Sequence, residues 1–370
     1  MKICYISSSA APSRNASSLQ IAKMCESFQK NGNKVTLIMP NTGNNKENYY
    51  KFYNIKNKYK IIKLKFFNRF PIGFYYYLFG ILSVLVSIRK KPKLIITRNF
   101  IVCAILVLLK KKNILEIHNS LDIEGRIVNF LFKNFRIFNS KKIIKIISIT
   151  HNLKKFYIKN YNVDKKKIYV LNSGSSLKFK FKKNNKISKK MNIGYFGSVN
   201  KSRGIELIIK LSKLDKKNNY FIYGWSKKEI NRLKYEAKIP KNLFLFEYIP
   251  YSKIKNQINK MDILLMPYTK KISVAGDVGD ISNFTSPLKL FDYLVSCRII
   301  IASNINILKE ILIKNKNCIF VKDYLNPYAW KLEIEKIKSN KKKFNSIKNF
   351  MYKTRNLYSN IDRAKKFLEL

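Results

Sequence analysis

The residues with the clearest chemical potential lie between Ser286 and Asn304, a segment that reads SPLKLFDYLVSCRIIIASN. Ser286 is a favourable N-cap residue and is followed by proline, so we expect a helix to start there. Leu288 begins the apolar side of this helix, whereas Lys289 and Asp292, three positions apart, share another face. A helix N-terminus beside a lysine and a carboxylate suits a nucleoside diphosphate.

A second candidate phosphate site follows the predicted strand that ends at Phe196. Gly197 and Ser198 form the turn after this strand, and Arg203 immediately precedes a predicted helix. A cation at that place adds a full charge to the positive end of the helix dipole, so Arg203 can hold a diphosphate.

Two further positions in the second half could flank a nucleotide base. Gly224 ends the next predicted strand, and Tyr248 follows the strand after it. A purely structural turn is the alternative interpretation at both positions.

The first half contains two candidate ligand sites. The loop Ser7–Asn15 joins the first predicted strand to the first predicted helix, and small residues such as Ser9 and Ala10 let backbone amides approach a phosphate or sugar. An ordinary polar loop is the alternative. His118 follows a short apolar strand, at the end where ligands bind in open parallel sheets, although a lone histidine can also be structural.

The chain is strongly basic, with 75 Lys and Arg against 21 Asp and Glu and a formal net charge of +54. This charge alone would suggest nucleic acid or an anionic membrane surface. Only 11 of the basic residues are Arg, which makes bidentate base contacts, and the lysines are spread over every segment without a basic block. We therefore expect no nucleic-acid partner, whereas a peripheral contact with anionic lipid agrees with the charge.

Metal binding is not expected. The chain has only two histidines, and its five cysteines are scattered without a CxxC pair. This pattern predicts a reduced, cytoplasmic environment, no structural zinc and no cofactor.

An apolar stretch of seventeen residues runs from Ile72 to Ile88. Its length is at the short edge for a membrane span and a predicted strand follows at once, so we expect a buried or membrane-facing surface helix. The chain starts with a strand at Lys2, and no signal peptide is expected before the fold. We predict a cytoplasmic protein that lies peripherally at the inner face of the membrane.

Apolar runs of strand length alternate with helical patterns in two series, as parallel α/β sheets require. We therefore expect an α/β fold with two Rossmann-like, doubly wound domains, 1–172 and 177–342, facing a cleft in which ligands bind, and a basic helix over 343–370. The predicted strands are Lys2–Ser7, Lys34–Met39, Ile61–Phe66, Lys93–Thr97, Ile114–Ile117, Ile143–Ser148 and Ile168–Leu171, then Met191–Phe196, Tyr220–Tyr223, Leu243–Phe246, Ile263–Met266, Ile299–Ala302 and Cys318–Val321.

The SPLKLFDYLVSCRIIIASN segment resembles the nucleotide-sugar-binding helix of family 4 (group 1) retaining glycosyltransferases, where SP-x-K-x-FEY precedes a small residue and an IVASD-like strand. Three further segments resemble motifs of that family. They are GYFGS with the RG that starts at Arg203, the EIH that ends at His118, and the YG that ends at Gly224. The resemblance covers almost the whole chain. It implies the GT-B fold, in which 177–342 binds the donor and the helix over 343–370 crosses back onto the acceptor domain.

The resemblance also implies roles for single residues. His118 would contact the transferred sugar, Ser9 and Ala10 would lie beside the donor phosphates and the acceptor, and Tyr248 would help to position the base. Asp292 would accept hydrogen bonds from the ribose hydroxyls.

Two positions depart from the family pattern. Ser198 stands where the family has an arginine and Arg203 where it has a lysine, so Lys289 is the expected replacement for the missing cation. Phe284 stands where the family has its first glutamate, and Asp277 or Asp280 could substitute for it.

The implied activity is metal-independent transfer of a sugar, with retention, from a nucleoside-diphosphate sugar to a saccharide or lipid-linked acceptor. Uridine is the usual base of such donors, and guanosine is the alternative. Cell-surface polysaccharide or lipopolysaccharide synthesis is the implied setting. Ser198 and Phe284 leave open a catalytically degenerate sugar-nucleotide-binding or scaffold protein of the same fold. A nucleotide-sugar 2-epimerase is a third possibility, but it would need more acid and base residues than the chain offers.

Overall fold

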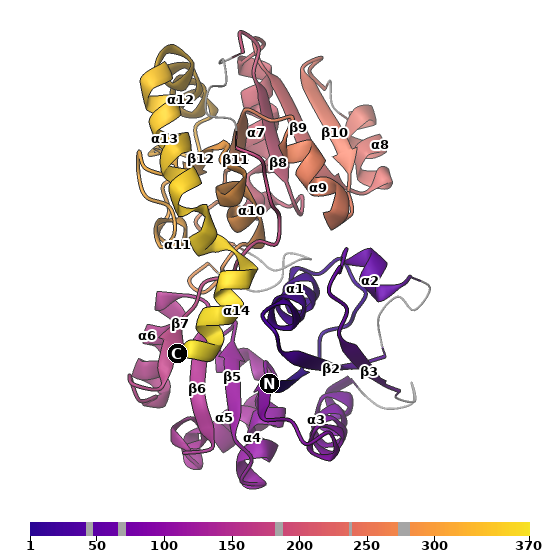
Figure 1. Cartoon of the computed structure of the whole chain (residues 1–370). Coiled ribbons are helices and arrows are strands. Elements are labelled where there is room, and N and C mark those ends of the chain that lie inside the picture. Colours follow the sequence, from indigo (N-terminus) through magenta and orange to yellow (C-terminus); the bar gives the residue numbers. More distant parts are fainter. Residues whose placement is uncertain (42–46, 66–71, 182–187, 237–238, 273–281) are drawn as a thin grey trace. The chain divides into compact units, whose positions relative to one another are not determined.

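The computed structural model describes residues 1–41, 47–65, 72–181, 188–236, 239–272 and 282–370. The chain divides into two compact units (Figure 1). The first unit consists of Met1–Ser173, Phe284–Ser286 and Asn360–Leu370, and the second of Gly174–Asn283 and Pro287–Ser359.

The first unit is built on a parallel sheet with the strand order β3-β2-β1-β4-β5-β6-β7. Its strands are short runs of β-branched and other apolar residues, which suits strands that are covered on both faces. The strands are β1 (Lys2–Ile6), β2 (Lys34–Pro40), β3 (Lys60–Leu64), β4 (Leu94–Thr97), β5 (Asn113–Ile117), β6 (Ile143–Ser148) and β7 (Ile168–Val170).

Helices cover both faces of this sheet. One face carries a core shared with α1, α2 and α14, and the other packs against α3 to α6. The helices are α1 (Ala16–Lys30), α2 (Tyr49–Phe52), α3 (Ile72–Arg89), α4 (Phe100–Leu108), α5 (Arg126–Asn134), α6 (His151–Tyr161) and α14 (Asn360–Glu369).

The second unit has a parallel sheet with the strand order β10-β9-β8-β11-β12-β13 and one continuous apolar core. Its strands are β8 (Asn192–Phe196), β9 (Asn219–Trp225), β10 (Leu243–Glu247), β11 (Ile263–Met266), β12 (Ile299–Ser303) and β13 (Ile319–Val321). Its helices are α7 (Ile205–Leu214), α8 (Lys227–Glu236), α9 (Tyr251–Ile258), α10 (Leu288–Ser296), α11 (Asn306–Lys309), α12 (Pro327–Ser339) and α13 (Lys341–Thr354).

The predicted fold class is confirmed, because both halves form doubly wound parallel sheets and every predicted strand is present. The single helix expected over 343–370 is wrong. A 3-10 turn at Arg355–Tyr358 divides it into α13, which belongs to the second unit, and α14, which belongs to the first. The apolar faces of the two pieces enter different cores, Met351 in the second unit and Phe367 in the first.

The apolar stretch that begins at Ile72 forms α3. Phe79 and Val84 are buried against the sheet, whereas Ile81 and Leu85 are about half exposed. Among the described residues, no helix combines the length and the apolar character needed to cross a membrane.

Candidate functional site

Lys289 lies in the first turn of α10, at the carboxyl-end side of the second sheet. The helix begins later than predicted, because Pro287 occupies the N-cap position and no side chain caps the helix. The hydroxyl oxygen of Ser286 instead accepts a hydrogen bond from the backbone N–H of Ser173, at 3.3 Å within the first unit. The predicted cap at Ser286 is therefore wrong, and Leu288 is the first helical residue.

Lys289 and Arg203 form a cationic cluster with two buried tyrosines. Lys289 Nζ donates a hydrogen bond to Tyr195 Oη at 2.6 Å and lies 5.4 Å from the ring centre of Tyr268. The Arg203 guanidinium lies 4.6 Å from the same Tyr268 ring centre. Burial, and then the charge of Arg203, lower the pKa of Lys289 well below its ordinary value. An anionic ligand beside both groups would favour the protonated form of Lys289.

The backbone beside Lys289 is made of closely packed glycines. Gly197 has a φ of +137° and Gly224 a φ of +133°, conformations that side chains disfavour. A Cβ atom on Gly197 would collide with Lys289 Nζ, and one on Gly224 would collide with the carbonyl oxygen of Gly197. Gly204, the N-cap of α7, abuts the carbonyl of Pro267 in the same way. The absence of side chains at Gly197 and Gly224 therefore lets the Gly197 turn pack directly against Lys289.

Asp292 lies one turn beyond Lys289 but contacts different groups. Its buried carboxylate accepts hydrogen bonds from the hydroxyls of Ser175, at 2.5 Å, and Tyr251, at 3.0 Å. Burial, and then the charge of Asp292, raise the pKa of Tyr251 well above its ordinary value, so this tyrosine remains a hydrogen-bond donor.

Ser198 and Tyr248, two other predicted site residues, are positioned by hydrogen bonds of their own main-chain groups. Ser198 is exposed, and its carbonyl accepts a hydrogen bond from Tyr195 Oη at 2.7 Å. Tyr248 follows the edge strand β10, and its backbone N–H donates to the carbonyl of Trp225 at 3.0 Å. The structure thus places both residues in turns at the carboxyl ends of strands, as predicted.

The positions considered for a sugar-facing carboxylate give a different result. Phe284 groups with the first unit, where its ring lies 5.1 Å from that of Phe156, so packing explains this residue. Asp277 and Asp280 lie outside the described residues.

His118 follows β5 in the first unit and belongs to a buried polar network. Glu116 accepts hydrogen bonds from Tyr5 Oη at 2.6 Å and from Arg363 Nη2 at 2.7 Å, and His118 Nε2 lies 3.1 Å from its carboxylate. Arg363 comes from α14 and also donates to the carbonyl of Asn172 at 2.7 Å. The last helix of the chain thus fixes the carboxylate beside His118.

The charges in this network set the protonation of His118. Burial opposes ionisation of Glu116, but Arg363, followed by His118 and Arg98, holds the pKa of Glu116 well below its usual value. Burial, and then the positive charge of Arg98, lower the pKa of His118 to about 4. His118 is therefore a neutral imidazole at neutral pH, which suits hydrogen bonding to a sugar hydroxyl better than anion binding by its own charge.

The loop that contains Ser9 and Ala10 is held by hydrogen bonds from neighbouring elements. Ser18, in α1, donates to the carbonyl of Ala10 at 2.7 Å, and the backbone N–H of Ser9 donates to Ser7 Oγ at 3.2 Å. Both residues are partly exposed at the carboxyl end of β1. Their backbone can therefore meet a ligand in a fixed conformation.

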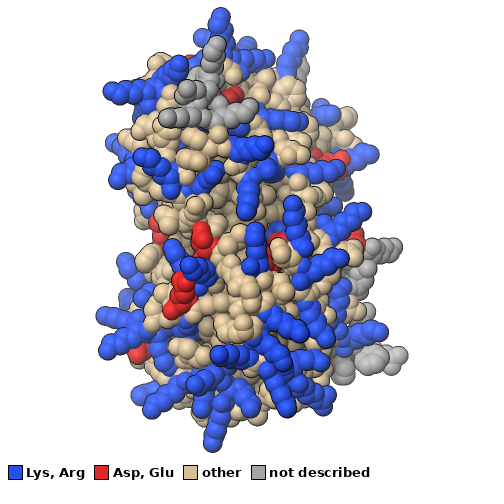
Figure 2. All heavy atoms as spheres, viewed as in Figure 1, with Lys and Arg blue, Asp and Glu red and all other residues tan. Residues whose placement is uncertain are grey.

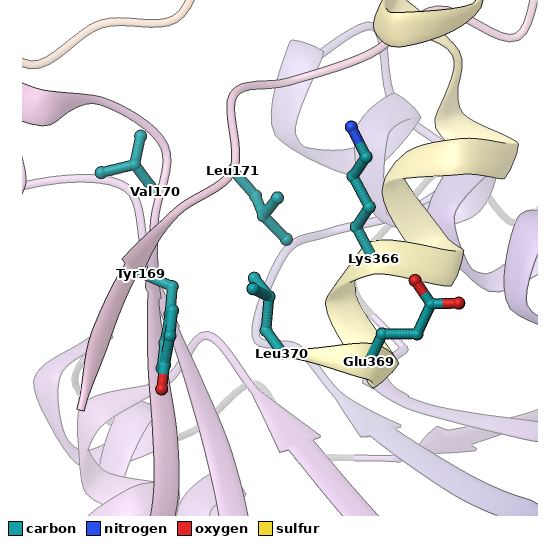
Figure 3. Close-up of a pocket in the computed structure, with 6 residues that line it drawn as sticks. All are labelled: Tyr169, Val170, Leu171, Lys366, Glu369 and Leu370. Carbon is teal, nitrogen blue, oxygen red and sulfur yellow. The ribbon is translucent and has the colours of Figure 1, made fainter. Parts of the chain in front are cut away.

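A separate cavity of about 250 Å³ lies between β7 and α14 in the first unit (Figure 3). None of its six lining residues is a predicted site residue; they are Tyr169, Val170, Leu171, Lys366, Glu369 and Leu370. Within the described ranges, no three His, Cys, Asp or Glu side chains come together as metal ligands.

Several residues of these sites are not predicted from the sequence. Tyr195 could have been found, because strand alternation places it two residues before Gly197 on the same face of β8. Tyr251, Ser175 and Arg363 carry no local signal, since their partners are 41, 117 and 247 residues away in the chain.

Comparison with known proteins gives one match to a family model, over the second half of the chain. Residues 177–354 match the model of the family Glycosyl transferases group 1. No curated protein matches the chain in sequence.

Solved structures show the same fold over the whole chain. Anabaena Alr3699/HepE in complex with UDP has a TM-score of 0.69 and 11% identity, with 100% of this chain and 99% of that chain covered. Sucrose-phosphate synthase from Thermosynechococcus elongatus has a TM-score of 0.71 and 12% identity, with 100% and 98% covered. The lipopolysaccharide outer core galactosyltransferase WaaB has a TM-score of 0.67 and 13% identity, also with 100% and 98% covered.

Proposed function

We propose that this protein is a retaining glycosyltransferase that moves a sugar from a UDP-linked donor to a saccharide or lipid-linked acceptor. The observation that carries the proposal is the pair of cations, Arg203 and Lys289, beside the glycine turn at Gly197. The family match covers these residues, and the similar HepE structures hold UDP or UDP-glucose. The likeness to WaaB supports a role in lipopolysaccharide or other cell-surface polysaccharide synthesis.

In the proposed reaction, the second unit stabilises the leaving diphosphate. Lys289 and Arg203 neutralise the charge that develops on its oxygens, and the N-terminal N–H groups of α7 and α10 add to this effect. The acceptor hydroxyl attacks from the face that the diphosphate leaves and gives its proton to the departing phosphate. Neither a metal ion nor a protein base is then required.

The remaining site residues bind and orient the donor. Asp292, whose carboxylate is fixed by Ser175 and Tyr251, is proposed to accept hydrogen bonds from the ribose hydroxyls. Gly224 and Tyr248 are proposed to flank the base. His118, neutral at pH 7, is proposed to hydrogen-bond the transferred sugar.

The proposal is tested by measuring UDP release from a panel of UDP-sugars, with saccharide and lipid-linked acceptors, in the presence of a metal chelator. We expect release with at least one donor, and an anomeric configuration in the product that matches the donor. Inversion at the anomeric carbon would contradict retention, and loss of release with the chelator would contradict metal independence.

A catalytically degenerate protein of the same fold is the second candidate. It is favoured by Phe284, which packs against Phe156 where a carboxylate would be expected, and by the uncharged Ser198. Such a protein would bind UDP-sugars in a calorimeter but release no UDP with any acceptor. Both candidate functions use the same binding site for the UDP-sugar. Only the active transferase would release UDP, so turnover distinguishes them.

We expect UDP binding to be accompanied by proton uptake at Lys289. The pKa of this lysine is lowered in the free protein, and a bound diphosphate would raise it. The affinity for UDP should therefore fall as the pH rises from the pKa of Lys289 in the free protein to its higher pKa in the complex. Calorimetry in buffers with different ionisation enthalpies measures this uptake; a binding enthalpy that does not depend on the buffer would contradict it.

We also propose peripheral binding to an anionic membrane through the first unit. The helix α5 and its flanks expose Ile123, Ile127, Phe130 and Phe135, each 60% or more accessible. Arg126 and Lys133 of the same helix are also exposed, and Lys and Arg cover much of the face seen in Figure 2. Apolar side chains within a basic surface suit the boundary between headgroups and acyl chains.

Vesicle sedimentation tests this proposal. The double variant Ile127→Ser/Phe130→Ser should bind vesicles with anionic lipid about a hundredfold more weakly than the wild type, because burial of each side chain is worth roughly 1.5 kcal/mol or more. Leu325→Ser/Leu357→Ser, which removes two similarly exposed side chains of the second unit, is the matched control. Equal binding by both variants, or no preference for anionic over neutral vesicles, would contradict the proposal.

A further inference from the structure

Arg98 lies in a polar cluster of which the proposed donor site uses only His118. It directly follows β4, whose residues pair in register with those of β5, so that Arg98 stands beside Glu116 at the carboxyl end of the sheet. Tyr5, in the neighbouring strand β1, faces the same side, as its hydrogen bond to Glu116 shows. Arg98 is therefore next to the network that holds His118.

The guanidinium of Arg98 makes little use of its hydrogen-bonding capacity. Its one hydrogen bond among the described residues runs from Nη1 to the carbonyl of Ser17, at a long 3.5 Å. No described carboxylate forms an ion pair with it. Its other N–H groups are not among the buried, unpaired polar atoms of the described residues, so they face solvent and a ligand can take the place of water on them.

The charges of the cluster do not balance. Glu116 contributes one negative charge, Arg363 and Arg98 contribute two positive charges, and His118 is neutral at pH 7. One positive charge is left over in a partly buried place. Arg363 is tied to Glu116 and to backbone carbonyls, so the excess charge is available at Arg98.

The surroundings of Arg98 favour an anion. The carbonyl it contacts belongs to the first turn of α1, which contains no acidic residue and has no side-chain cap. His118 is 15% exposed, so a ligand can reach the same place. Arginine binds phosphate through two parallel hydrogen bonds.

We propose that Arg98 and the first turn of α1, beside His118, form a site in the first unit for a phosphate group of the acceptor. The proposal rests on the glycosyl transfer proposed above, since it names the chemical class of the acceptor. It assigns Arg98 to substrate binding and leaves the chemistry of transfer to the second unit.

Nuclear magnetic resonance of the full-length chain tests the site without measuring turnover. The chain has only two histidines, so carbon-13 labelling of histidine gives two ring signals, and His151→Gln assigns them. Inorganic phosphate should shift the His118 signal in a saturable way, with saturating UDP present, and should raise the pKa of His118. No saturable response of His118 would overturn the proposal.

Substitutions at Arg98 provide a second test of the phosphate site. Arg98→Ala should weaken phosphate binding at His118 by about tenfold or more, because charge-assisted hydrogen bonds are lost. It should also raise the pKa of His118 in the free protein, since Arg98 lowers it. Arg89→Ala removes an exposed arginine at the end of α3 and should behave as the wild type. If Arg98→Ala does not fold, Arg98→Gln is measured; wild-type phosphate affinity in the variant would refute the site.

The source of the phosphate is settled by two ligands. Glucose 1-phosphate presents the group on a soluble sugar, and decyl phosphate in neutral vesicles presents it on a lipid. Binding of the first alone identifies a soluble acceptor, binding of the second alone a lipid-linked one, and both results support the site. UDP binding is measured separately, so a failure of the donor site is recognised independently of the phosphate site.

Discussion

Replacement of Lys289 by methionine is expected to lower kcat/KM for the UDP-sugar by about a hundredfold to a thousandfold, the usual effect of removing a group that stabilises transition-state charge. Methionine keeps the apolar stem of the side chain and removes only the ammonium group. UDP binding should weaken by about tenfold or more for the same reason. Steady-state kinetics and calorimetry measure the two effects.

The fold should survive this substitution. Tyr195, the partner of Lys289, keeps its hydrogen bond to the carbonyl of Ser198. Lys213→Met, at an exposed lysine of α7, is the matched control and should leave both constants unchanged. Equal kcat/KM values for the two variants would contradict the assignment of Lys289 to the donor site.

Replacement of Arg363 by methionine is expected to destabilise the first unit by about 3–5 kcal/mol, since it leaves the buried carboxylate of Glu116 without its cation. Both tryptophans, Trp225 and Trp330, lie in the second unit, so their fluorescence reports on that unit alone. Urea unfolding followed by circular dichroism should therefore show an earlier transition that tryptophan fluorescence does not follow.

The effect of Arg363→Met should depend on pH. In the wild type, the pKa of Glu116 is lower in the folded state, so its contribution to stability is complete above the usual value of 4.5 and is lost as the pH falls below it. The difference between wild type and variant should then shrink in acid. Adding Glu116→Gln to the variant should recover part of the loss at pH 7, because no charge is left unpaired. A double variant as unstable as the single one would show that Arg363 acts through packing alone.

The strands could be predicted from the sequence because buried parallel strands are short apolar runs between polar segments. Lys34–Pro40 and Ile299–Ser303 show this pattern, and their limits agree with prediction to within a residue. The ends of helices were harder to predict. Ser286 was assigned as a cap from its residue type, but its oxygen is used by Ser173, which is 113 residues away.

The candidate site could be predicted only where motif and chemistry coincide in one segment. Lys289, Arg203 and Gly197 were found because each lies beside a strand or helix end that the sequence reveals. The partners that set their properties were not found. Tyr268 and Arg363 approach the predicted site residues from other elements, and such contacts depend on the packing of the complete fold.

The place of α14 in the first unit has a consequence for how the chain is made. Ala364 and Phe367 complete the core of that unit, yet they leave the ribosome after the whole second unit. Domains usually fold in order of synthesis, N-terminal first. Here we expect the second unit to fold earlier. The core of the first unit stays incomplete at Phe28 until Phe367, whose ring centre lies 5.5 Å from that of Phe28 in the folded protein, has been synthesised. A nascent chain stalled before residue 360 should therefore expose apolar surface in its first unit and bind chaperones there.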